Sequence, residues 1–211
     1  MADRVVPQAR DLSRKLLSKM PKRWAHTTGV AAEVTRLYRA LQMDQDDAEG
    51  VLAAAWLHDI GHAPRLRDTG FYPLDGALYL NRRQWSFQIC SLVANQCGAR
   101  FAAADLGLGR RLWPFRGTEG PALDLLTYAH LTVAADGAPT SAPDGITDLL
   151  GSADPHSPAG RDRAFYLTAV ARRVEASLEP RGLPPAIGPD HAVARAPLSG
   201  RGHDTTSLII T

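Results

Sequence analysis

The chain has 211 residues and a formal net charge of +2 at neutral pH. This length allows one domain with a substantial core and is too short for two large ones. Only 7% of the residues are aromatic, Val and Ile are sparse, and Ala, Leu and Arg dominate. This balance favours helices packed on helices over a sheet sandwich. The composition therefore predicts an all-α fold, built as a single-domain helical bundle.

Several classes of protein are disfavoured by the same data. No apolar run approaches the roughly 20 residues of a membrane span, and the N-terminus lacks the apolar block of a signal peptide. We therefore expect a cytoplasmic protein with no membrane partner. Basic residues gather near the N-terminus, but no aromatic residue interleaves with them before Trp24. They are interpreted as a solvated helix face, and no specific nucleic-acid binding is expected.

The first third of the chain has the clearest helical periodicity. Apolar residues recur at helical spacing around residues 6–17 and again over 21–41. Asp44 has the character of an N-cap, because acidic residues follow it in the first turn of a third helix, which carries the apolar run 51–57. This helix is expected to end at the sequence His58-Asp59-Ile60-Gly61, with Gly61 as the stop signal.

The rest of the chain alternates loops and helices. Loops are expected over 62–73 and over the Arg- and Gly-rich segment 109–120. The apolar segment 122–136 is expected to be the last core helix, with Gly137 as its stop. Residues 180–211 are rich in Pro and Gly and are interpreted as an extended tail on a domain of residues 1–179. Shorter helices are predicted over 74–81, 87–96, 99–108 and 162–178, with a turn-rich stretch from 137 to 160.

The pair His58-Asp59 stands at the end of an apolar helix and is the strongest chemical signal. A buried Asp is unfavourable unless it is paired or binds a metal ion. Imidazole and carboxylate together suit zinc, manganese, iron or cobalt. The preceding residues 51–57 carry no charge, so both polar side chains emerge directly from the core. The pair therefore indicates a metal site.

Two further residues complete the predicted ligand set. His26 lies near the start of a long amphipathic helix, and Asp136 ends the last apolar core helix. With His58 and Asp59 they offer two imidazoles and two carboxylates to one divalent ion, with positions left for water and substrate. His130 lies six residues before Asp136, on a different side of the helix, and is interpreted as a core histidine or one that supports the ligands without binding the metal.

The order and context of these residues resemble the HD-domain superfamily of metal-dependent phosphohydrolases. The resemblance rests on Trp24-Ala25-His26-Thr27, on Leu57-His58-Asp59-Ile60-Gly61-His62, and on Ala134-Ala135-Asp136, and it covers roughly residues 10–150. It implies a helical metal site and hydrolysis of phosphomonoesters, phosphodiesters or nucleotides. The expected cofactor is one divalent ion, with Mn, Co, Ni, Zn, Fe and Mg all open.

The sequence also departs from the family pattern. Dinuclear members take further His ligands from the interval between His62 and His130, which here contains no histidine. Tyr72, Asn95 and Gln96 stand where such ligands would be sought. A mononuclear site is therefore expected, and the dinuclear phosphodiesterase and oxygenase activities are not.

Candidate catalytic residues lie close to the metal ligands. Mononuclear members often carry Glu three residues after the HD aspartate, and His62 occupies that position. It could act as a general acid or bind phosphate, or it could be a loop histidine that either supports the metal ligands or faces solvent. Asp59, or a nearby aspartate such as Asp68 or Asp75, could accept the proton of the attacking water. Arg65 and Arg67 are the candidates for substrate binding, because arginine pairs well with phosphate.

The expected partner is a small phosphorylated substrate, such as a nucleotide, and a homodimer is left open. Two alternatives remain beside the hydrolase. One is a regulatory or binding module that kept the fold and the metal ligands but lost turnover. The other is an HD-fold enzyme of specialised metabolism that uses redox-active iron, since the fold alone does not decide the chemistry.

Overall fold

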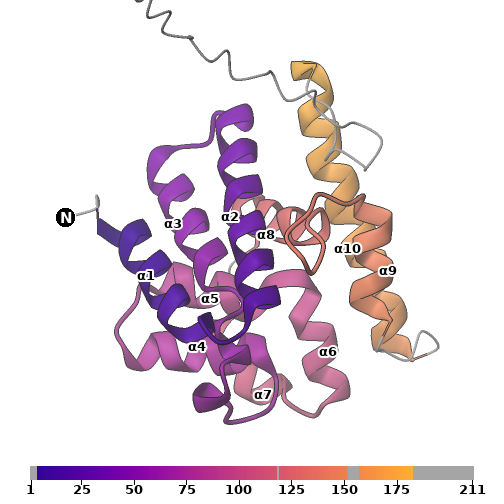
Figure 1. The fold of residues 1–211 in the computed structure, drawn as a ribbon. Coiled ribbons are helices and arrows are strands. Elements are labelled where there is room, and N and C mark those ends of the chain that lie inside the picture. The colour runs from indigo at the N-terminus through magenta and orange to yellow at the C-terminus, as the bar shows by residue number, and fades with distance from the viewer. Residues whose placement is uncertain (1–3, 118, 152–156, 183–211) are drawn as a thin grey trace, which may run out of the picture.

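The computed structural model describes residues 4–117, 119–151 and 157–182. Within these ranges the chain is α-helical and holds no β-strand. Val133 and Pro139 form one isolated antiparallel bridge. The helices pack into one bundle (Figure 1). The prediction of an all-α fold is therefore confirmed.

The helices differ widely in length, and short 3-10 turns (η) connect several of them. In chain order they are α1 (Val5–Leu17), α2 (Pro21–Leu41), α3 (Gln45–Leu57), η2 (Ile60–His62), η3 (Pro64–Leu66), α4 (Tyr72–Arg82), α5 (Phe87–Asn95), η4 (Gln96–Gly98), α6 (Ala99–Asp105), α7 (Gly109–Leu112), η5 (Trp113–Phe115), α8 (Pro121–Leu131), α9 (Ala142–Leu150), α10 (Pro158–Leu178) and η6 (Glu179–Arg181).

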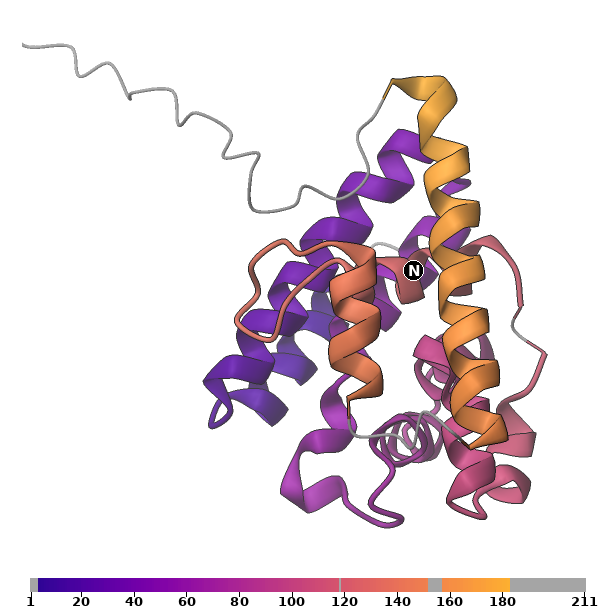
Figure 2. The same ribbon diagram turned by 90° about the vertical axis from the view of Figure 1, so that its right-hand side faces the viewer.

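Helix α3 is the central element of the bundle. It packs against α1, α2, α5 and α8. Ala53, Ala54 and Ala55 are fully buried, and their small side chains allow the neighbouring helices to approach closely. Helix α2 also contacts α8, while α9 and α10 stand side by side against α8 (Figure 2). The packing of α2, α3 and α8 on one another brings together three helices that carry candidate ligands.

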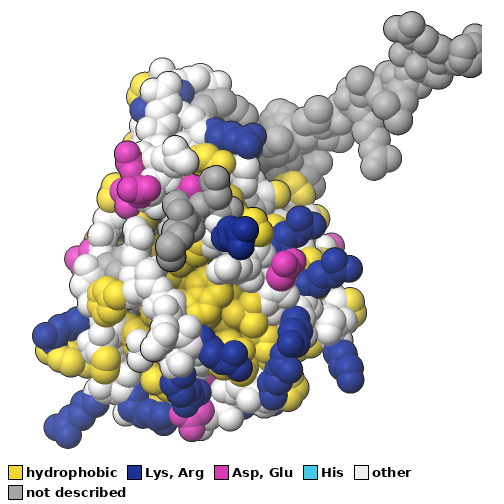
Figure 3. Space-filling view, turned by 90° about the vertical axis from the view of Figure 1, so that its left-hand side faces the viewer, with side chains coloured by type: hydrophobic (Ala, Val, Ile, Leu, Met, Phe, Trp, Pro, Cys, Tyr) yellow, Lys and Arg dark blue, Asp and Glu magenta, His cyan; other side chains and the backbone are white. Residues whose placement is uncertain are grey.

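The surface follows the expected pattern. Arg10, Arg14 and Lys15 of α1 are exposed, as predicted for a solvated face. On this side of the molecule, Lys and Arg side chains surround a central area of hydrophobic side chains (Figure 3). None of the described helices, including the 21-residue α2 and α10, is long and apolar enough to cross a membrane.

Most predicted helices are present, but α8 ends earlier than predicted, and α7 and α9 lie in segments predicted as loop or turn. Asp44 caps α3 as expected, its side chain accepting a hydrogen bond from the backbone N–H of Asp46. Helix α8 ends at Leu131, five residues before the predicted end at Asp136. The expected turn-rich stretch contains α9, which begins after the N-cap Ser141. Pro143 suggested a turn in the sequence, but proline is well tolerated in the first turn of a helix, where it lies here. Residues 183–211, most of the predicted tail, lie outside the described residues.

Gly61 allows the turn after α3 to pack against the start of α4. A Cβ atom at this position would overlap the carbonyl oxygen of Tyr72 and lie 2.8 Å from the backbone nitrogen of Gly76. Both obstacles are backbone atoms, which cannot move aside as a side chain can. The close approach holds the segment between His58-Asp59 and α4 in place.

Replacing Gly61 by Ala should therefore lower the free energy of unfolding by about 2 to 3 kcal/mol. Gly50→Ala is the matched control, because its added Cβ meets only the flexible end of the Gln88 side chain. The control should be neutral or slightly stabilising, since Ala favours the helix by up to about 1 kcal/mol. Urea unfolding of both variants measures the difference. Equal effects would contradict this account of the turn.

Candidate metal centre

The pair His58-Asp59 follows directly on α3, and both side chains are fully buried. His58 is the C-cap residue of α3 and directly follows its last turn. Its Nδ1 is 2.7 Å from the carbonyl oxygen of Ala55, so Nδ1 carries the proton and donates. The lone pair of Nε2 is therefore available. That atom is buried and has no hydrogen-bond partner among the described residues.

His26 reaches the same place from the second turn of α2. Its Nδ1 lies 3.0 Å from the carbonyl oxygen of Ala134, in the segment after α8. Gly29 and Gly137 allow this close approach: a Cβ at Gly29 would lie 2.6 Å from Val133, and one at Gly137 would lie 2.6 Å from the carbonyl oxygen of Ala25. The bond to Ala134 assigns the proton to Nδ1 and leaves Nε2 directed at the cluster.

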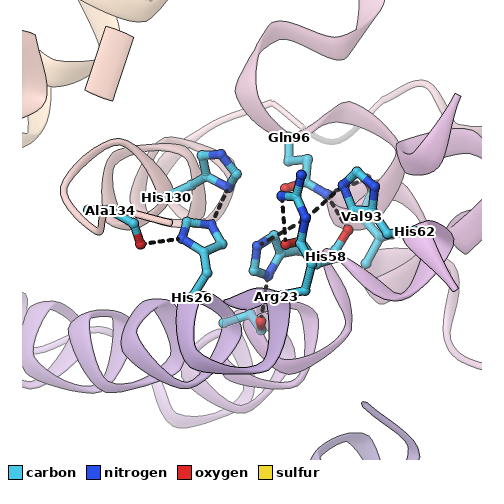
Figure 4. A network of polar contacts seen from close by, with 10 residues as sticks. Arg23, His26, His58, His62, Val93, Gln96, His130 and Ala134 are labelled. Atoms are coloured by element: carbon cyan, nitrogen blue, oxygen red, sulfur yellow. Dashed lines mark hydrogen bonds and ion pairs between the residues drawn. The ribbon is translucent and has the colours of Figure 1, made fainter. Parts of the chain in front are cut away.

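His130 from α8 completes a cluster of three imidazoles (Figure 4). The ring centroids lie 4.7 Å apart for His26 and His130, 5.3 Å for His58 and His130, and 5.4 Å for His26 and His58. One nitrogen from each ring lies within 4.8 Å of the others. These three residues come from three different parts of the sequence and could hold a metal ion.

The electrostatics of the cluster favour the forms that bind metal. Burial lowers the pKa of His26, and burial lowers the pKa of His130 well below its ordinary value. Burial alone would raise the pKa of Asp59, but His58, His26 and His62 outweigh it and the net shift is downward. His26 and His130 are therefore neutral and the carboxylate of Asp59 is ionised at neutral pH, as metal ligation requires.

The distances between these donors fit a shared ion. Two atoms that bind one ion at about 2.1 Å lie about 3.0 to 3.4 Å apart at octahedral or tetrahedral angles. Nε2 of His26 is 3.3 Å from Nδ1 of His130, and Nε2 of His58 is 3.5 Å from Oδ1 of Asp59. Oδ1 of Asp59 is also buried without a hydrogen-bond partner in the described part of the chain. The three imidazoles could hold one ion, and the carboxylate of Asp59 lies next to His58, one of the three.

Asp136, predicted as the fourth ligand, does not join this cluster. Its side chain is exposed, and its Oδ1 accepts a hydrogen bond from the backbone N–H of Ala138. The physical reason is the early end of α8, which places Asp136 in the turn beyond the helix. His130, interpreted from the sequence as a core histidine, is the residue of α8 that reaches the cluster. Its position in an otherwise apolar segment was the signal that could have identified it.

His62 borders the cluster. It lies in η2, its side chain is 20% exposed, and its ring stacks on Tyr72 with the centroids 4.0 Å apart. Its Nε2 lies 3.6 Å from Oδ1 of Asp59. Burial lowers the pKa of His62 to about 4, with Asp59 acting in the opposite direction. The His62 ring lines the cavity beside the cluster and does not face bulk solvent. This position is compatible both with a role in catalysis and with support of the ligand Asp59.

The other predicted catalytic residue, Asp75, has a structural setting. It is buried, and its carboxylate accepts hydrogen bonds from the backbone N–H and hydroxyl of Thr69, each at 2.8 Å, and from the N–H of Gly70 at 3.1 Å. Asp75 therefore holds the loop before α4 and does not face the cluster. The sequence alone did not distinguish the two roles of Asp75, because an aspartate near a metal motif can either anchor a loop or take part in catalysis.

A cavity of about 880 Å³ opens over the cluster. His26, His62 and His130 form part of its wall. Arg65 and Arg67, the predicted substrate-binding residues, are exposed and do not belong to the described residues that line it. Sequence reasoning gave no functional role to Arg23, Gln96 or Arg163, each of which lines the cavity.

Arg23 connects the cavity to the candidate ligands. It stands one turn before His26 on α2, and its Nη1 donates to Oδ2 of Asp59 at 3.4 Å. Arg163 of α10 donates from Nε to the carbonyl oxygen of Cys97 at 3.0 Å. The spacing Arg23-x-x-His26 was a usable signal for the first, because residues three apart share a helix face. Nothing local in the sequence indicated Arg163.

Comparison of the chain with models of known protein families, with curated proteins and with solved structures finds no match. The site is therefore characterised by its own geometry.

Proposed function

We propose that this protein is a metal-dependent phosphohydrolase of the HD type, which hydrolyses a phosphomonoester or nucleotide-like phosphoester. The observation that carries the proposal is the convergence of His26, His58 and His130, with Asp59 beside His58. Two of these histidines, His26 and His130, line a cavity that Arg23 and Arg163 also line. The donor set would hold one divalent ion, and the two guanidinium groups suit an anionic phosphoryl group.

The ion would supply two kinds of chemistry, because a bound divalent metal acidifies water and polarises a phosphoryl oxygen. The chain contributes the rest. Arg23 and Arg163 would bind and orient the phosphoryl oxygens. His62, kept neutral by its lowered pKa, is suited to accept the proton of the attacking water. This assignment replaces the general-acid role considered from the sequence.

The donor set also narrows the choice of metal. Magnesium prefers oxygen ligands, whereas imidazole suits zinc, iron, cobalt and nickel. Three of the four candidate ligands here are imidazoles. We therefore expect zinc, iron, cobalt or nickel to support activity, and magnesium to support it poorly.

A second candidate function is oxidative chemistry with iron. It is favoured by the same histidine-rich donor set with one carboxylate, which resembles the ligands of non-haem iron oxygenases. Iron loading under anaerobic conditions followed by oxygen uptake measurements on candidate organic substrates would detect it.

The test of the main proposal is a phosphatase screen of the metal-free protein. Nucleoside monophosphates, cyclic nucleotides and p-nitrophenyl phosphate are each supplied with Zn²⁺, Co²⁺, Ni²⁺, Mn²⁺, Fe²⁺ or Mg²⁺. The proposal is supported if phosphoester cleavage requires zinc, iron, cobalt or nickel and is abolished by EDTA. Absence of cleavage with every metal, in a protein that binds the metals, would refute it.

A further inference from the structure

Gln96 is fully buried at the start of η4, directly after α5. Its Nε2 donates two hydrogen bonds, to the carbonyl oxygen of His58 at 2.7 Å and to that of Val93 at 3.2 Å. Both partners are acceptors, so the orientation of the amide is determined: the nitrogen faces them and the oxygen faces away. Gln96 thus ties the backbone of a candidate metal ligand to the end of α5.

The amide oxygen of Gln96 is left without a partner. Oε1 is buried and has no hydrogen-bond partner among the described residues, although the residue lines the same cavity as His26, His62 and His130. Leaving a buried acceptor unpaired is unfavourable, so this atom calls for a donor from the cavity. A fully ionised phosphate carries no proton and is not that donor. A water molecule carries two.

We infer that Oε1 of Gln96 accepts a hydrogen bond from a water molecule beside the histidine cluster and orients it for attack on the substrate. The second part of this statement rests on the proposed hydrolysis. The first part does not. Figure 4 shows Gln96 beside the candidate site, with its Nε2 donating to the carbonyl oxygen of His58. One amide therefore supports a ligand through its nitrogen and holds the water through its oxygen.

Azide provides a readout that is independent of turnover. It can displace water at a metal site, but it has no proton to donate to Oε1. In the parent protein it must therefore compete with a water that Gln96 stabilises. Gln96→Met has a similar shape and lacks the acceptor, so azide should bind the Co²⁺-loaded variant about three- to tenfold more tightly than the parent, as expected for one hydrogen bond. The cobalt absorption spectrum reports the binding.

Asn95→Leu is the matched control. The neighbouring Asn95 forms the same kind of tether, with Nδ2 donating to the carbonyl oxygens of Ser91 at 2.9 Å and Phe115 at 2.8 Å. It does not belong to the described lining of the cavity with the histidines. Its replacement should leave azide affinity unchanged within about twofold. Should Gln96→Met fail to fold, Gln96→Asn keeps an amide but withdraws its oxygen by one methylene and should show the same tightening.

The outcomes separate this inference from the proposed function. Tighter azide binding by the Gln96 variant alone supports the water contact, and a fall in kcat of at least about tenfold with little change in KM supports orientation for attack. Unchanged azide affinity overturns the inference even if the parent hydrolyses phosphoesters. Gln96→Met also removes the Nε2 bond to the backbone of His58, so azide affinities are compared between proteins with equal Co²⁺ content. If the Gln96 variant binds azide more tightly than the parent but the parent hydrolyses no phosphoester, the water contact is supported and the proposed function is refuted. A parent that binds no Co²⁺ contradicts both.

Discussion

Asp59→Ala is expected to remove the bound metal and to lower phosphoester hydrolysis by at least about 10³-fold. Asp59 contributes the only carboxylate beside the three imidazoles among the described residues, and its Oδ1 lies within 3.6 Å of nitrogens of both His58 and His62. Its lowered pKa keeps it ionised at neutral pH. Without it the site loses its one negative charge. Elemental analysis and steady-state kinetics measure the two effects.

Two further variants separate the effect of the Asp59 charge from that of its size, and separate loss of a metal ligand from loss of a buried structural carboxylate. Asp59→Asn keeps the size of the side chain and should still lose most of the metal. Asp75→Asn removes a carboxylate that is equally buried but bound to Thr69 and Gly70, so it should lower stability and leave metal content unchanged. If Asp75→Asn removed the metal while Asp59→Asn retained it, the assignment of the ligands would be wrong.

His62→Ala should lower kcat by about 10² to 10⁴-fold while the metal content stays at the parent level. The ring faces the cavity and is held by stacking on Tyr72, with Nε2 3.6 Å from Oδ1 of Asp59. Burial lowers its pKa to about 4, so the ring is neutral near neutral pH and its nitrogen lone pair is free to act as a base. Removing it takes away the proton acceptor and leaves the three clustered imidazoles in place.

Tyr72→Leu is the informative companion to this variant. It removes the ring on which His62 stacks and leaves the imidazole itself, so the loss of kcat should be smaller than for His62→Ala. A His62→Ala protein with unchanged kcat would exclude His62 from the chemistry. The alternative of a binding module that lost turnover would then gain support if the parent were also inactive on every ester.

Much of the fold and part of the site could be predicted because the relevant signals are local. The apolar run before His58 and the capping Asp44 indicated α3, and they placed His58 and Asp59 at its buried end. His26 was identified by its position near the start of an amphipathic helix. These features depend on neighbouring residues, which the sequence displays directly.

The errors arose where tertiary packing decides the outcome. Asp136 seemed to end a helix because apolar residues continue to Ala135, but α8 ends at Leu131 and the following segment folds back against α2. The Gln96 tether and the approach of Arg163 to Cys97 join residues whose proximity depends on the packing of separate helices. No pattern within one segment indicates such contacts.

The measurement that tests the central claim most directly is the metal content of three proteins prepared side by side: the parent, His130→Ala and Asp136→Ala. The site built from His26, His58, Asp59 and His130 predicts about one ion per chain in the parent and in Asp136→Ala, and at least a tenfold weaker affinity in His130→Ala. Asp136 is exposed and bonded to Ala138, so its loss should not matter. Full metal content in His130→Ala, with loss in Asp136→Ala, would contradict the account.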